Sequence, residues 1–297
     1  MSRAFLIVNP TAGGGRTSRL WPSIRDRLRQ LGLEFEARET SGPGSATELA
    51  DTAVSAGWPL VVAVGGDGTV NEVVNGLIDR DGRPRGTFGA ILTGRGRDAS
   101  RNLGIALDPS TALHRLVHGE EVHADLGTAE WRGGSRYFVN CAGAGFDAVV
   151  ARRAQSIGRS GTLPYVLGIL AALGQHRPVP ASIEVDGRSA WNGPMTAAVV
   201  ANGPYFGGGM RIAPAAAPDD GRLDLVILGA LGRAELLAWL PSVYRGSHLR
   251  NAKVTTVRGQ TMTIDASPSV PVQVDGEPVA STPVRVSIRP GALRLRR

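Results

Sequence analysis

The chain has 297 residues, which is enough for two domains and a sizeable hydrophobic core. Its formal net charge is +7, but it has no run of five basic residues and no basic patch interleaved with aromatics, which argues against nucleic acid as a partner. Cys141 is the only cysteine, which excludes an intramolecular disulfide and a paired-cysteine metal site and is typical of a reducing cytosol.

Strands and helices alternate over the first 120 residues. Apolar runs predict strands at 4–8, 35–39, 60–64 and 89–92. Helical spacing predicts helices at 20–31, 45–54, 69–78 and 109–118. Two S/T-x-x-E capping boxes, Ser45 with Glu48 and Thr69 with Glu72, are expected to begin the second and third helices. Asp108 is expected to be the N-cap of the fourth helix, with Pro109 at its first position. This alternation predicts a parallel sheet that binds its ligands at the carboxyl ends of the strands.

After about residue 120 the pattern changes to short alternating strands. They are expected at 122–129, 136–142, 182–186, 195–201, 223–228, 253–257, 260–264, 272–275 and 284–288. Two helices are expected at 164–173 and 233–244. We therefore predict an α/β plus mainly β protein. Its N-terminal parallel α/β nucleotide-binding domain covers 1–120, and an antiparallel β-sandwich-like domain covers 121–297.

The most informative segment is Gly65-Gly66-Asp67-Gly68-Thr69, between the third predicted strand and its helix. Glycines let backbone N–H groups approach an anion, and a helix N-terminus favours negative charge. A carboxylate in such a loop suits a phosphate site that holds Mg²⁺, or a site that accepts a proton from an attacking hydroxyl. The segment is neither the P-loop nor the dinucleotide fingerprint.

GGDGTVNEVVNGL at 65–77 resembles the signature of the diacylglycerol kinase catalytic domain, the family of bacterial lipid kinases and sphingosine kinases. The resemblance covers nearly the whole chain. Its further blocks are Asn9-Pro10 with 13–16, Thr40, Asn140 with 143–147, 207–210 with 212–214, 219–224, and the closing 275–278.

The resemblance implies roles for residues that spacing alone leaves open. Glu277 sits after a D-G pair that is often only a hairpin turn, but relatives use this acid to accept the proton of the lipid hydroxyl. Asp67 would be the second catalytic residue, with nucleotide and Mg²⁺ as its partners. Asp220 fits a polar turn equally well; relatives hold a structural Mg²⁺ there, which implies the backbone carbonyls of Ala217 and Arg222. The nucleotide-binding set is then Asn9, Thr40, Gly65, Gly66, Asp67, Gly68, Thr69, Asn71, Glu72, Gly94, Arg95 and Arg97.

One block departs from the family pattern. Relatives carry P-x-GTGND-F-A-R after the fourth strand, whereas this chain has TGRGRDASR at 93–101. Arg95 and Arg97 replace the threonine and the asparagine of this pattern, and the threonine normally helps to hold the nucleotide. They are either solvated surface charges or, as their place at a strand end favours, contacts to the phosphates.

We therefore expect an ATP-dependent, Mg²⁺-requiring kinase that phosphorylates a diacylglycerol-like or sphingoid lipid. The longest apolar stretch, 163–174, is too short to span a bilayer, so we expect a cytoplasmic protein that takes its lipid from a membrane surface by peripheral contact. Two alternatives remain: an NAD kinase-like small-molecule kinase, and a non-catalytic protein that binds lipid or nucleotide with a diverged loop. The lipid's identity stays open, as does the choice between monomer and homodimer.

Overall fold

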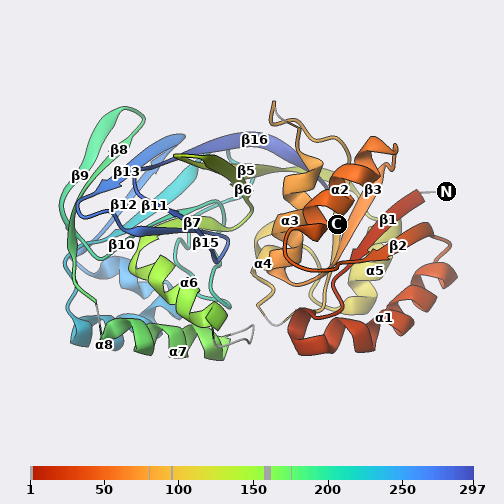
Figure 1. Cartoon of the computed structure of the whole chain (residues 1–297), viewed down its shortest axis with the longest axis horizontal. Helices are drawn as coiled ribbons and strands as arrows, with labels where there is room; N and C mark the ends of the chain where they lie inside the picture. The colour runs from red at the N-terminus through yellow and green to blue at the C-terminus, as the bar shows by residue number, and fades with distance from the viewer. Residues whose placement is uncertain (1–2, 80, 95, 157–161, 175) are drawn as a thin grey trace. The chain divides into compact units, whose positions relative to one another are not determined.

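The computed structural model describes residues 3–79, 81–94, 96–156, 162–174 and 176–297. The chain divides into two compact units, which we call unit 1 (1–124 with 291–297) and unit 2 (125–290). The sequence places the border at 120, and in the structure the last seven residues return to unit 1 (Figure 1).

Unit 1 is built on a parallel sheet with the order β2-β1-β3-β4. Its strands are β1 (Arg3–Val8), β2 (Glu34–Glu39), β3 (Leu60–Gly65) and β4 (Thr87–Leu92). Near the end of the chain, Leu295 of β16 (Val284–Arg296) pairs in parallel with Phe88 of β4. Strands β1, β3 and β4 are almost wholly buried, as expected for strands covered on both faces.

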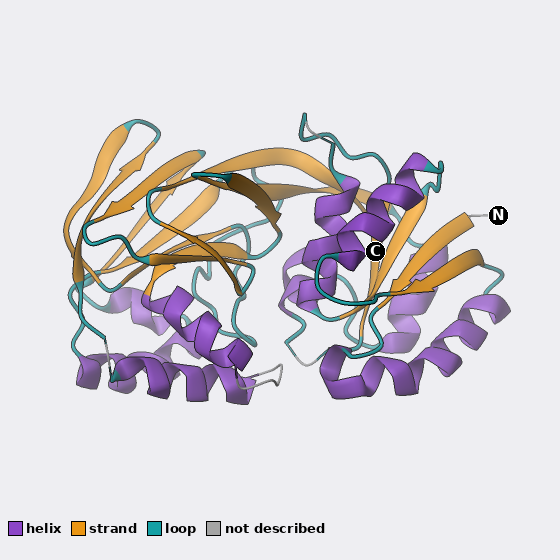
Figure 2. Ribbon diagram, viewed as in Figure 1, coloured by secondary structure: helices purple, strands orange, loops and turns teal. Residues whose placement is uncertain are grey.

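Helices cover the sheet of unit 1 on both sides (Figure 2). They are α1 (Ala12–Gln30), α2 (Ser45–Ser55), α3 (Asp67–Leu77), α4 (Asp98–Leu103) and α5 (Pro109–His118). Helix α1 contacts α5, and α2 contacts α3. The predicted N-cap of α5 is confirmed, because the side chain of Asp108 accepts a hydrogen bond from the N–H of Thr111.

Unit 2 contains two antiparallel sheets. One has the order β16-β13-β8-β9, with β5 and β6 alongside, and the other has the order β12-β11-β10-β7-β14-β15. The strands are β5 (Glu121–Trp131), β6 (Gly134–Phe138), β7 (Cys141–Gly145), β8 (Val179–Val185), β9 (Arg188–Met195), β10 (Ala197–Ala201), β11 (Leu223–Leu228), β12 (Val254–Gly259), β13 (Thr261–Ala266), β14 (Pro271–Val274) and β15 (Glu277–Ser281).

Three layers make up unit 2. The two sheets enclose one core, to which Ile183 and Val286 contribute from one sheet and Leu225 from the other. The opposite face of the second sheet, including Val199 and Val226, packs against helices. These helices are α6 (Phe146–Ser156), α7 (Thr162–Leu173), α8 (Arg233–Arg245) and the short 3₁₀ helix η1 (Ser247–Arg250). The predicted fold class, a parallel α/β domain followed by an antiparallel sheet domain, is confirmed.

Neither predicted capping box forms, although α2 begins at Ser45 as predicted. Helix α3 begins at Asp67 rather than Thr69, and the hydroxyl of Thr69 accepts a hydrogen bond from the side chain of Asn9 instead of capping the helix. Helix α2 begins after Gly44, and its free N–H groups are bonded by Glu72 of α3: the Glu72 carboxylate accepts from Gly44 at 3.0 Å and from Ala46 at 3.1 Å. The acid that caps α2 therefore comes from a neighbouring helix.

The strand expected at 136–142 is in fact two strands, β6 and β7. Between them, the N–H groups of Val139 and Asn140 point to the carboxylate of Asp275 instead of joining a ladder. Helices α4 and α6 and strands β9 and β15 were not predicted, because each is short or lacks a clear apolar period.

We predict that Glu72→Ala lowers the free energy of unfolding by about 1–2 kcal/mol, because it leaves two N–H groups of α2 without their acceptor. A urea titration measures the loss. Glu48→Ala is the matched control, since Glu48 is exposed on α2 itself, and we expect it to cost less than half as much. Equal losses would show that Glu72 does not act as the cap.

Candidate functional site

The loops after the four strands of unit 1 meet at the carboxyl edge of the sheet. Asn9 follows β1 and its N–H bonds the carbonyl of Val64 at 2.9 Å. Thr40 follows β2 and its N–H bonds the carbonyl of Val8 at 2.9 Å. Thr93 follows β4 and its N–H bonds the carbonyl of Gly65 at 2.8 Å. This is the edge where open parallel sheets bind their ligands.

The loop after β3 touches the loops after β1 and β4. The side-chain amide of Asn9 donates to the hydroxyl of Thr69 at 3.0 Å. A Cβ atom on Gly94 would lie only 2.9 Å from the Cα atom of Gly66, so these two backbones approach as closely as glycine alone permits. Several N–H groups at the start of α3 therefore lie beside two glycine backbones, which suits the approach of an anion.

The carboxylate of Asp67 is buried against the start of α4. Its Oδ1 atom accepts from the N–H of Ala99 at 3.0 Å, and Oδ2 lies so near Gly96 that a Cβ atom there would come within 2.6 Å. Burial raises the pKa of Asp67, while the N–H groups of residues 97–99 and the charge of Arg101 act in the opposite direction. Asp67 thus ties the β3 loop to the β4 loop.

Of the two arginines in the segment 93–101, which departs from the family pattern, the structure describes only Arg97. Arg95 lies outside the described residues. Arg97 adopts a left-handed conformation with φ 55°, and its guanidinium donates to the carbonyls of Gly94 at 3.2 Å and Leu107 at 3.3 Å. These bonds connect Arg97 to backbone carbonyls on both sides of it in the chain and so stabilise the loop. Contact between Arg97 and a phosphate stays a prediction. The same holds for Asn71, which is buried on α3, and for Glu72, which caps α2.

The other predicted acids lie in unit 2. Glu277 begins β15, and its Oε2 atom accepts from the guanidinium of Arg136 on β6 at 2.7 Å. The turn before it is held by Asp275, whose carboxylate accepts from the N–H groups of Val139, Asn140 and Cys141 at 2.8–3.0 Å. The Glu277 carboxylate therefore projects from a turn with little freedom and is oriented by a fixed cation.

Asp220 carries an ion pair in this structure. One of its oxygens bonds the guanidinium of Arg258, and the other accepts from the N–H of Arg222 at 3.0 Å. Arg258 also lies 3.3 Å from Asp224. A cation at Asp220 would have to displace Arg258. The described residues hold no group of three or more His, Cys, Asp or Glu side chains suited to a metal, and the Mg²⁺ assignment to Ala217, Asp220 and Arg222 stays a prediction.

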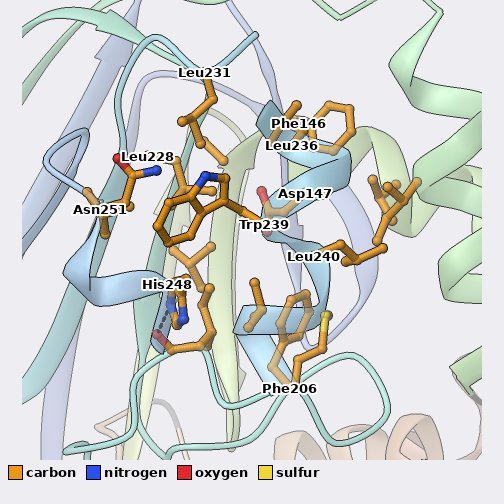
Figure 3. A pocket seen from close by; sticks show the side chains of 18 residues that line it. Phe146, Asp147, Phe206, Leu228, Leu231, Leu236, Trp239, Leu240, His248 and Asn251 are labelled. Carbon is orange, nitrogen blue, oxygen red and sulfur yellow. Dashed lines mark hydrogen bonds between the residues drawn. The ribbon is translucent and has the colours of Figure 1, made fainter. Parts of the chain in front are cut away.

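Unit 2 also contains an apolar pocket that the sequence did not reveal (Figure 3). It lies between the second sheet and the helices, and three polar side chains line it: Asp147, His248 and Asn251. The other lining residues are Phe146, Val150, Ile169, Ala197, Val199, Phe206, Met210, Ile212, Leu228, Leu231, Leu236, Trp239, Leu240, Val243 and Val254. Such a lining suits a hydrocarbon chain.

Asp147 connects this pocket, through Gln273, to the turn that precedes Glu277. Its Oδ2 atom accepts from the side-chain amide of Gln273 at 3.0 Å, and the amide oxygen of Gln273 accepts from the N–H of Gly276 at 2.6 Å. A Cβ atom on Gly143 would collide with the Asp147 carboxylate at 1.8 Å, so glycine is required there. Sequence reasoning did not select Asp147 or Gln273 as site residues. The only signal was that Asp147 ends the family block formed by Asn140 with 143–147.

Two protein-family models match the chain. Residues 3–129 match the diacylglycerol kinase catalytic domain, and residues 140–297 match the YegS C-terminal NAD kinase beta sandwich-like domain. Diacylglycerol kinase of Bacillus subtilis (strain 168) is 31% identical over 280 residues, which cover 93% of this chain and 90% of the relative. Diacylglycerol kinase of Mycobacterium tuberculosis (strain ATCC 25618 / H37Rv) is 29% identical over 300 residues, with coverage of 100% and 96%.

Solved structures share the fold. A diacylglycerol kinase from Bacillus anthracis str. Sterne superposes with a TM-score of 0.76 at 23% identity, covering 99% of this chain and 96% of that one. An NAD kinase from Archaeoglobus fulgidus in complex with ATP gives a TM-score of 0.51 at 14% identity, covering 99% and 93%. At these identities the likeness concerns the fold alone.

We predict that Asp147→Asn changes the pH dependence of stability. Burial raises the pKa of Asp147 from 3.8 to about 6, so the folded state holds this proton more tightly than the unfolded state. The wild type should therefore lose stability relative to Asp147→Asn as the pH rises from about 4 to about 6, by about 2–3 kcal/mol, with no further change above. Denaturant titrations at several pH values test this, with the exposed Asp219→Asn as control. A constant difference across that range would contradict it.

Proposed function

Because this chain belongs to the diacylglycerol kinase catalytic-domain family, we propose that it transfers the γ-phosphoryl group of ATP to a hydroxyl of a diacylglycerol-like or sphingoid lipid. It is a kinase by that membership. The observation that carries the choice of a lipid is the pocket of unit 2, in which 15 of the 18 lining residues are apolar.

The same pocket argues against the NAD kinase-like alternative. A dinucleotide carries two phosphates and two riboses, and its site must offer polar partners for them. Asp147, His248 and Asn251 are few for that task, and the Nε2 atom of His248 is already bonded to the carbonyl of Ile212 at 3.0 Å. An acyl or sphingoid chain needs no such partners.

The proposed reaction divides between the two units. In unit 1, the N–H groups at the start of α3 and the glycine backbones of the β3 and β4 loops would hold the phosphates, with Asn9 and Thr40 nearby on the same sheet edge. In unit 2, Glu277 would accept the proton of the attacking lipid hydroxyl, while Arg136 holds its carboxylate in place. Mg²⁺ bound with ATP would neutralise charge on the transferred phosphoryl group.

Among the described residues, no helix is both long and apolar enough to cross a membrane. We therefore propose that the protein reaches its lipid by peripheral contact with a membrane surface, in the cytoplasm.

The proposal is tested by incubating the protein with γ-labelled ATP, Mg²⁺ and mixed micelles of single neutral lipids, with NAD in a parallel reaction. We expect label in a diacylglycerol or a sphingoid base and none in NAD. Labelled NAD would establish the small-molecule kinase instead. Stoichiometric binding of nucleotide without label in any acceptor would establish the non-catalytic alternative.

We predict that Glu277→Gln lowers kcat by about 10²–10⁴-fold, with little change in ATP affinity, because the proposed partner of this acid is the lipid hydroxyl. Asp67→Asn should also remove most turnover. Unlike Glu277→Gln, it should weaken ATP binding as well, since the Asp67 carboxylate ties together two loops of the phosphate site. Steady-state kinetics and ATP titration separate the two effects.

Glu184→Gln and Asp26→Asn are the matched controls, because both residues are exposed and lie away from the proposed site in units 2 and 1. Both controls should keep normal turnover. Loss of ATP binding alone in Glu277→Gln would contradict its role as base, and near-normal turnover in Asp67→Asn would remove Asp67 from the site.

A further inference from the structure

Exposed large apolar side chains are concentrated on two helices of unit 2. Among the described residues there are four such side chains: Leu107 (44% exposed), Leu167 (42%), Leu170 (50%) and Leu237 (44%). Leu107 lies in unit 1, whereas the other three lie on α7 and α8. On the surface of a soluble protein, exposed large apolar side chains are normally found singly. Three such side chains on two helices of the same layer therefore indicate a surface that binds a partner.

The rest of these two surfaces is also apolar. Besides its leucines, α7 exposes Ala171, and the described side chains of α7 (167–173) include no charged group. On α8 the exposed residues between its two ends are Ala234, Leu237, Ala238 and Pro241. We call these outward surfaces of α7 and α8 the apolar face.

The charges on α8 that flank the apolar face favour an anionic partner. Helix α8 begins with Arg233 and ends with Arg245, and both are exposed. The acid of this helix, Glu235, is paired with Lys253 at 2.6 Å, so its charge is compensated locally. An apolar surface bordered by exposed arginines matches a bilayer that contains anionic lipids, where hydrocarbon lies beneath negative headgroups.

The inward sides of the same helices line the apolar pocket. Ile169 contributes from α7, and Leu236 and Leu240 contribute from α8. In Figure 1 both helices lie on the side of unit 2 away from β13 and β16. A bilayer docked on the apolar face would thus lie one helix layer away from the pocket. This favours a bilayer over a second copy of the chain.

We propose that the outward faces of α7 and α8 dock the protein on an anionic lipid bilayer. The proposal deepens the proposed function, because it names the surface from which the lipid would enter. Its evidence is separate, since it rests on exposed leucines and arginines that are not part of the pocket or of the phosphate site.

Vesicle sedimentation tests the docking without ATP. The full-length protein should sediment with vesicles of phosphatidylglycerol and phosphatidylcholine and much less with phosphatidylcholine alone. Leu170→Ser and Leu237→Ser should each weaken binding about tenfold, and Arg233→Gln with Arg245→Gln should remove the preference for the anionic vesicles. Leu107→Ser and the exposed hairpin variant Arg188→Gln are the matched controls and should bind like the wild type.

Two further measurements distinguish docking on lipid from misfolding and from self-association. Thermal unfolding should be unchanged in every variant, since the altered side chains are exposed. Light scattering should give the same mass for wild type and variants; a wild-type dimer that Leu170→Ser or Leu237→Ser dissociates would assign the face to a second copy and overturn the proposal. The docking proposal is also overturned if the wild type does not sediment with anionic vesicles or if the serine variants bind these vesicles as strongly as the wild type.

Turnover separates this proposal from the proposed function. On a water-soluble, short-chain diacylglycerol, the serine variants should keep the kcat of the wild type, while on vesicle-borne lipid they should lose activity in step with binding. If no lipid is phosphorylated at all, the proposed function fails, but the sedimentation result still decides the docking.

Discussion

The close approach of the β3 and β4 loops at the carboxyl edge of unit 1 is the constraint on which the candidate phosphate site depends. Gly94 and Gly66 approach so closely that no side chain fits between them, and Asp67 binds the start of α4 from the other loop. Burial disfavours the charged form of the Asp67 carboxylate, and the hydrogen bonds that it accepts from backbone N–H groups offset part of this effect. These contacts hold the described residues of the departing segment, 93–94 and 96–101, against the β3 loop.

In unit 2 a half-buried carboxylate has the corresponding structural role. Asp275 collects three N–H groups at the break between β6 and β7, which fixes the turn from which Glu277 projects. Gln273, two residues earlier on β14, reaches both this turn and Asp147 at the pocket wall. The turn that carries the proposed base is thus bonded to the pocket that would hold the substrate, so a change in Asp147 can reach Glu277 through one amide side chain.

The sequence predicts elements whose cause is local and misses those whose cause is distant. The strand at 60–64 and the N-cap Asp108 follow from neighbouring residues, and both are confirmed. The capping boxes fail because Thr69 and Glu72 find partners 60 and 26–28 residues away. Likewise, no residue near 136–142 indicates that Asp275, more than 130 residues later in the chain, accepts the N–H groups between β6 and β7 and so ends the strand there.

The candidate site residues divide in the same way, into those that local motifs indicate and those that only the fold brings together. Asp67 and Glu277 could be selected as candidates because ordered motifs carry them, and their roles stay predictions. The pocket could not be predicted because its lining comes from several separated segments that become neighbours only in the folded chain. Helix α7 illustrates the limit. A run of apolar residues is typical of a buried helix, and the inner side of α7 is part of the core through Ile169, Ala172 and Leu173.

Its outer side, however, exposes Leu167 and Leu170, which a purely structural helix would replace by polar residues. A helix that is apolar all round is stable in water only when something covers both of its sides. Helix α6 and the core beside the second sheet cover one side of α7, and no described element of the chain covers Leu167 and Leu170 on the other. The composition of this helix is therefore explained by folding on its inner side and by interaction on its outer side.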